Sequence, residues 1–138
     1  MYGINNTIIG TSNNETFVTD GDNTFLTGGG GTDTFIINEM PILISDIKTI
    51  RLFDFTKEDR IITGTKTPLT HVNGFEFTGK AGETIITWLL PYYPEFNTSI
   101  PTVIITIDQD GNKSADIKIE LIGEQSSYGT YYYYQAIT

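Results

Sequence analysis

The sequence predicts an all-β protein: a short parallel β-roll of about four nine-residue units that continues into an antiparallel, β-sandwich-like cap. A glycine-rich nine-residue pattern recurs near the N-terminus, and the rest consists of short apolar segments separated by turn residues. Thr, Asn, Gly, Tyr, Phe and Ile are abundant, which is typical of strands and turns. We therefore assign residues 1–37 to the roll and residues 38–138 to the cap, within one structural unit.

The clearest unit of the repeat runs from Gly28 to Ile36 and reads GGGGTDTFI. It fits the pattern G-G-x-G-x-D-x-U-x, in which U is a large apolar residue, of calcium-binding parallel β-helices. Glycines allow positive φ and leave carbonyl oxygens accessible, so Gly28 and Gly30 are candidate metal ligands together with the carboxylate of Asp33. The apolar residue that follows, Phe35, is expected in the core.

Shorter copies precede this unit, and each has a polar residue, a threonine and an apolar residue. Their apolar positions, Ile8, Phe17, Phe25 and Phe35, are separated by 9, 8 and 10 residues. Because alternate turns of a β-roll lie on the same side, we expect Phe17 to stack under Phe35 and Ile8 under Phe25.

The loops of the repeat should pair in the same way as the strands. The pairing of loop 10–15 with loop 28–33 brings together two carboxylates, Glu15 and Asp33. The other pairing, of loop 3–6 with loop 19–23, has asparagines at those places, with Asp20 and Asp22 nearby. Calcium needs 6–8 oxygen ligands, so we expect one good site at most, at Glu15 and Asp33, and a weaker second one. The alternative is a roll whose loops are held by asparagines and water without metal.

Pro41 marks the end of the repeat. A strand centred on residues 47–53 and a second one starting at Ile61 are separated by a polar turn over 56–60. Asp54, just before this turn, and Asp59, within it, are further candidate calcium ligands.

Aromatic residues gather in the second half of the chain. Trp88, Tyr92 and Tyr93 lie in a proline-rich connection over residues 86–101, where they are candidates for stacking on sugar rings or for covering the core. A final strand is predicted over 128–137, and its tyrosines offer either a contact surface or an ordinary edge strand.

The segment from Asp108 to Asp116 separates two alternating apolar runs, 103–107 and 117–122. Asp110-Gly111 is a strong hairpin signal. An EF-hand loop has glycine at its sixth position, whereas Gly111 is at the fourth, so a plain hairpin is favoured over a calcium loop.

Composition excludes several classes of function. The net charge of −9 argues against nucleic acid as a partner, and no apolar run is long enough to span a membrane. The absence of cysteine excludes disulfides and thiolate sites, and the single histidine, His71, excludes a multi-histidine zinc site. No catalytic signature is present, so we expect a non-catalytic protein.

The order of these features resembles the RTX (repeats-in-toxin) family, as found in the C-terminal domain of serralysin-type metalloproteases and in alginate epimerase R-modules. The resemblance covers residues 10 to 123. It rests on the glycine-rich array, on the strand followed by Asp54-Phe55, on Phe75 to Thr84 and on the Asp108-to-Asp116 segment. It implies Ca²⁺ as the bound ion, and secretion through a type I system with folding outside the cell.

The leading hypothesis is therefore a calcium-stabilised, extracellular β-roll module of a secreted bacterial protein. The alternatives are a module that binds a polysaccharide or a protein through Trp88, Tyr92 and Tyr93, and a metal-free structural or assembly domain with a degenerate roll.

Overall fold

The computed structural model describes residues 7–19, 24–37, 47–56, 58–64, 67–123 and 137–138. Its described part contains strands and turns and no helix, so the all-β prediction is confirmed. Accordingly, it has no helix long and apolar enough to cross a membrane. Residues 128–136 of the final strand predicted over 128–137, and the candidate ligands Asp20 and Asp22, lie outside the described residues.

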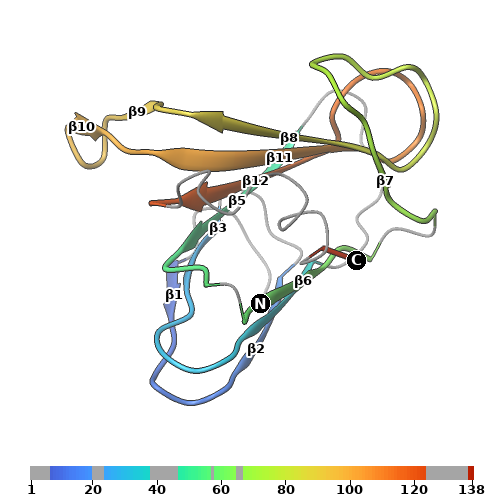
Figure 1. Cartoon of the computed structure of the whole chain (residues 1–138). Coiled ribbons are helices and arrows are strands. Elements are labelled where there is room, and N and C mark those ends of the chain that lie inside the picture. Colours follow the sequence, from blue (N-terminus) through green and yellow to red (C-terminus); the bar gives the residue numbers. More distant parts are fainter. Residues whose placement is uncertain (1–6, 20–23, 38–46, 57, 65–66, 124–136) are drawn as a thin grey trace.

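The N-terminal half is a parallel roll whose successive strands alternate between two sheets (Figure 1). Strands β1 (Thr7–Ile9), β3 (Thr24–Thr27) and β5 (Lys48–Phe53) pair in parallel in the first sheet. Strands β2 (Thr16–Thr19), β4 (Thr34–Ile37) and β6 (Arg60–Ile62) pair in parallel in the second. The roll therefore extends past residue 37, because β5 and β6 add a third turn to it.

One of the two predicted stacks is confirmed and the other is wrong. Phe17 pairs with Phe35, and their rings stack with centroids 5.2 Å apart. Ile8, however, pairs with Leu26, and Thr7 is the partner of Phe25. The reason is that Thr24 and Leu26 face inward on β3, whereas Phe25 faces outward and carries the Arg51 guanidinium 4.9 Å from its ring centroid.

The core lies between the two sheets and is lined by apolar side chains from every strand of the roll, two each from β4 and β5. With Leu26 in place of Phe25, the inward positions Ile8, Phe17, Leu26 and Phe35 are each nine residues apart. Leu52 and Ile61, also nine apart, continue the two stacks, and Ile137 forms a parallel bridge with Ile61. The fully buried Phe55 packs beside Phe35.

The C-terminal half prolongs the first sheet instead of forming a separate layer. Strand β12 (Ile117–Ile122) pairs in parallel with β5, and β11 (Thr102–Asp108) and β8 (Glu83–Leu89) follow as antiparallel neighbours. The short β7 (Thr70–His71) completes a seven-stranded sheet. A small hairpin of β9 (Tyr92–Tyr93) and β10 (Thr98–Ser99) extends from its end. The predicted cap is thus joined to the roll edge to edge, as Figure 1 shows.

Candidate functional site

The β11–β12 hairpin loop gathers three carboxylates at one point. Asp108, Asp110 and Asp116 each offer one oxygen, and these oxygens lie within 4.8 Å of one another. Asp108 is buried, Asp116 is partly buried and Asp110 is exposed. Three hard oxygen ligands on one short loop are a group that can hold a metal ion.

The backbone of this loop wraps around the Asp108 carboxylate. Its Oδ1 accepts the N–H of Gly111 at 2.9 Å, and its Oδ2 accepts the N–H of Lys113 at 2.9 Å. Asp116 Oδ2 accepts the Gln109 N–H at 2.7 Å from the other side of the loop. These bonds fix the two less exposed carboxylates in place before any ion is bound.

Polar side chains recur at every second residue of the loop: Asp108, Asp110, Asn112, Ser114 and Asp116. An EF-hand loop uses its odd positions as ligands in the same way and makes a sharp turn at the sixth. The sixth residue here is Lys113, which has a φ of 71°. Lys113 thus has the positive φ for which an EF-hand loop uses glycine at its sixth position, and Gly111, with a φ of 76°, is a second residue in that region. The predicted hairpin and the acidic cluster coexist.

Mutual repulsion and burial both act on this cluster. Burial raises the pKa of the Asp116 carboxyl, and the neighbouring Asp110 and Asp108 carboxylates raise it further. A cation placed among them would remove this repulsion and favour the charged forms.

The loop between β7 and β8 lies beside the β11–β12 loop (Figure 1) and contacts its backbone. Gly82 donates its N–H to the Asp108 carbonyl at 2.7 Å. Gly111 has a φ of 76° and lies so close to the loop that a Cβ there would be 2.9 Å from the Gly79 carbonyl oxygen. Glu83 holds the supporting loop by accepting the N–H groups of Thr78 and Gly79.

The roll carries a second set of carboxylates, in three stacked six-residue loops: 10–15, 28–33 and 54–59. Their last residues, Glu15, Asp33 and Asp59, occupy equivalent positions. The N–H of Glu15 donates to Asp33 Oδ1 at 3.0 Å, and the N–H of Asp33 donates to Asp59 Oδ1 at 2.8 Å. The carboxylates of Asp33 and Asp59 therefore each support the backbone of the loop before their own.

Two of the predicted ligands have their oxygens engaged elsewhere. The Glu15 carboxylate turns back on its own loop and accepts the N–H and hydroxyl of Thr11, which lower its pKa. Asp54, with a φ of 52°, accepts the N–H groups of Gly28 and Gly29, both at 2.9 Å. The predicted calcium ligands Glu15 and Asp33 are therefore neighbours, joined by the hydrogen bond from the Glu15 N–H to Asp33 Oδ1. Their carboxylates do not face a common point, because that of Glu15 is bound to Thr11.

Asp33 differs from the other roll carboxylates. Its Oδ2 is the buried side-chain oxygen that lacks a hydrogen-bond partner in the described part of the chain, and the residue is 0 % exposed. Burial raises its pKa, and the carboxylates of Asp59, Glu15 and Asp54 raise it further. A Cβ on Gly28 would lie 2.5 Å from this oxygen, so glycine there leaves it the room it occupies. Gly30 instead lies over Ser12 and donates its N–H to the Thr11 carbonyl at 2.8 Å.

The three predicted aromatic binding residues have different surroundings. Trp88 and Tyr92 are 48 % and 57 % exposed. Tyr93 is buried, with its hydroxyl 3.1 Å from the Thr102 hydroxyl, so it is a core residue and is not available to a ligand. Because the two adjacent residues are both tyrosines, sequence alone does not show which of them faces inward.

Comparison of the chain with protein-family models and with curated protein sequences finds no match to either.

Proposed function

We propose that this chain is a non-catalytic, calcium-binding module that calcium stabilises, built on a β-roll of the RTX kind and acting outside the cell. The observation that carries the proposal is the convergence of Asp108, Asp110 and Asp116 on one loop. The unpartnered Asp33 Oδ2 supports a second cation position in the roll.

Calcium fits these donors better than the other common metal ions do. All the side-chain ligands on offer are oxygens, which suit hard cations, and zinc would favour nitrogen or sulfur. Ca²⁺ also accepts 6–8 ligands in flexible geometry, whereas Mg²⁺ demands a near-ideal octahedron. The surplus of acidic residues, a net charge of −9, favours cation binding in general.

Secretion is the part of the proposal that composition supports. A chain without cysteine cannot be stabilised by disulfides outside the cell, so a bound metal ion would provide the stabilising cross-link. Extracellular modules bind calcium with Kd of about 10⁻⁴–10⁻³ M. Inside the cell, where free calcium is far lower, the acidic loops would repel one another, and export would precede metal-assisted folding.

The test is thermal unfolding with EGTA, with Ca²⁺ and with Mg²⁺, combined with calorimetric titration. At a hundredfold excess over Kd, a ligand stabilises the native state by about 2.7 kcal/mol, which corresponds to a rise in Tm on the order of 10 °C. We expect this rise with Ca²⁺, and a much smaller one with Mg²⁺. An unchanged Tm and no heat of binding at 10⁻² M Ca²⁺, about tenfold above the weakest expected Kd, would refute the proposal.

Three variants separate the two positions. Asp110→Asn removes an exposed carboxylate from the hairpin cluster, and Asp33→Asn removes the buried one from the roll. Glu76→Gln is the matched control, since it also changes the net charge by one, at an exposed position that belongs to neither group of carboxylates. We expect each aspartate variant to lose part of the calcium stoichiometry, and Glu76→Gln to behave as the wild type.

One observation favours a metal-free structural roll as the second candidate. In the roll, the carboxylates of Glu15, Asp54 and Asp59 already accept hydrogen bonds from N–H groups with both oxygens. A roll satisfied in this way can fold without calcium. If Ca²⁺ affects only the hairpin and Asp33→Asn leaves the calcium stoichiometry unchanged, the roll is structural.

The exposed Trp88 and Tyr92 leave a polysaccharide or a protein as a further partner of the same module.

A further inference from the structure

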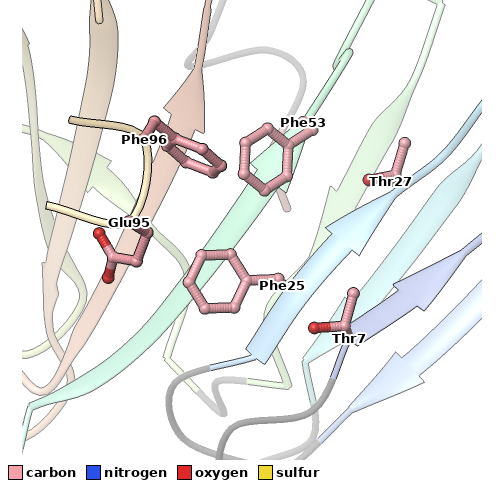
Figure 2. A pocket seen from close by; sticks show the side chains of 6 residues that line it. All are labelled: Thr7, Phe25, Thr27, Phe53, Glu95 and Phe96. Carbon is pink, nitrogen blue, oxygen red and sulfur yellow. The ribbon is translucent and has the colours of Figure 1, made fainter. Parts of the chain in front are cut away.

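A groove of about 360 Å³ lies on the outer face of the first sheet, beside the turn between β9 and β10. It is distinct from both acidic sites. Its walls come from four elements of the fold and consist of Thr7, Phe25, Thr27, Phe53, Glu95 and Phe96. Figure 2 shows the three rings around this space, with the Glu95 carboxyl group on one side and the two threonines on the other.

The aromatic walls are held in place by their neighbours. The rings of Phe25 and Phe53 are stacked with centroids 6.0 Å apart, and Phe96 meets Phe53 edge-on at 5.7 Å. The turn that carries Phe96 is closed by its N–H, which donates to the Tyr93 carbonyl at 3.0 Å. Phe96 remains 45 % exposed, so part of its ring is open to a ligand.

The charge of the groove is negative. Glu95 is the one charged side chain among the six lining residues, and the whole chain carries −9. The same aromatic cluster already holds a cation, since the Arg51 guanidinium lies over the Phe25 ring. That guanidinium is paired with Glu120, 2.7 Å from its Nε, a carboxylate that also pairs with Lys118, and it is not part of the lining.

These features select the kind of cation. Aromatic rings attract cations through their quadrupole, and Glu95 adds a full charge. Beyond Glu95 and the two threonine hydroxyls, however, the lining side chains have no hydrogen-bond acceptors with which to replace the water around a primary ammonium or a metal ion. A cation covered with methyl groups has little such hydration to lose.

We propose that this groove binds a small quaternary ammonium compound, with the cation against the rings of Phe96 and Phe53 and its charge compensated by Glu95. The site does not depend on calcium or on the proposed function. Its probe is choline, and the control ligand is 3,3-dimethylbutan-1-ol, which has the same shape without the charge.

The experiment is a titration of the ¹⁵N-labelled protein by NMR at constant ionic strength. Choline should shift the amide signals of Thr27, Phe53 and Phe96 saturably, and the neutral isostere should bind at least about threefold more weakly. Phe96→Leu, which keeps apolar volume without the ring, and Glu95→Gln, which keeps shape without the charge, should each weaken choline by about threefold. Phe75→Leu and Glu76→Gln, at exposed positions outside the groove, serve as matched controls and should change nothing.

Three results would overturn the assignment. These are the absence of saturable shifts at groove residues, equal binding of choline and its neutral isostere, and unchanged affinity in both groove variants. The two groove substitutions are at exposed positions of a turn, so we expect both variants to fold. The NMR spectra recorded before choline is added will check this directly.

Discussion

Asp33 and Asp59 occupy equivalent places in stacked roll loops, yet their carboxylates differ in hydrogen bonding and should affect the stability of the fold in opposite directions. Asp59 accepts the N–H of Asp33 with one oxygen and the N–H of Thr56 with the other, both at 2.8 Å. Asp33 has one oxygen engaged and the other buried without a partner. A buried carboxylate oxygen without a hydrogen bond is costly, so the two side chains should respond differently to the same substitution.

We expect Asp33→Asn to stabilise the calcium-free protein by on the order of 1 kcal/mol, because it removes a buried charge and keeps the acceptor for the Glu15 N–H. Asp59→Asn should destabilise it by about 1–3 kcal/mol, since one N–H would then face an amide NH₂. Urea unfolding in EGTA measures both. Equal destabilisation by the two changes would mean that the Asp33 carboxylate is as well satisfied as that of Asp59.

Glu83 is a residue whose role depends on pH. Its carboxylate accepts the hydroxyl and N–H of Thr78 and the N–H of Gly79, and these bonds lower its pKa from 4.5, the Thr78 hydroxyl bond most. A group whose pKa is lowered on folding contributes stability above its unfolded pKa, and this contribution is lost as pH falls through the folded pKa.

Glu83→Gln should therefore lower Tm at pH 7, and its difference from the wild type should shrink as pH falls below 4.5, the ordinary glutamate value. Melting curves over this pH range check it. A difference that stays constant down to acid pH would show that packing, and not the charge of the carboxylate, sets the effect. Glu76→Gln again provides the control.

At the scale of the element, strand β3 shows why the period of a repeat does not fix its phase. The sequence pattern predicted that Phe25 is equivalent to Phe17 and Phe35, because each of the three follows a threonine. The structure places Leu26 in the core, 0 % exposed, and turns Phe25 outward toward Arg51 and Phe53. In a strand, a shift of one residue exchanges the two faces.

The assignment of β3 can be tested by truncating each side chain. Leu26→Ala should cost about 2–5 kcal/mol, the usual range for a buried leucine. Phe25→Ala should cost less, on the order of 1 kcal/mol, since it loses a partly exposed ring and a cation–π contact. Chemical unfolding of both variants shows which of the two residues faces the core. A larger loss of stability in Phe25→Ala than in Leu26→Ala would mean that Phe25 is the core residue.

The features that were predicted best from the sequence are those that depend on residues close to one another in the chain. The strand class, the nine-residue spacing, the Phe17–Phe35 stack and the hairpin at Asp110-Gly111 each depend on neighbours in the chain. The third roll loop, 54–59, was harder to recognise because residues 38–46 interrupt the period before it. The convergence of Asp108, Asp110 and Asp116 was not predicted, because the loop was judged by the position of its glycine, and the residue with positive φ at the sixth position is a lysine.

The pairing of β5 with β12 joins the two halves of the molecule. Strand β5 has the roll strand β3 on one side and the antiparallel half on the other, so the first sheet is continuous across both. Ile50, Leu52, Ile119 and Leu121 are buried at this junction. Because the first sheet and the core extend across both halves of the described structure, the roll and the C-terminal half should unfold as a single cooperative unit.

Damage to the roll should therefore be felt at Trp88, the single tryptophan, which lies on β8 in the other half. Gly29 has a φ of 88°, and a Cβ there would lie 1.9 Å from the Thr11 carbonyl oxygen, so Gly29→Ala should cost more than about 2 kcal/mol. Gly30→Ala is the control from the same glycine run, since its nearest neighbour would be Ser12 at 3.5 Å, and its cost should stay within about 1 kcal/mol. In Gly29→Ala, Trp88 fluorescence and far-ultraviolet circular dichroism should shift together to lower denaturant. A fluorescence transition that stays in place while the dichroism shifts would show that the two halves unfold separately.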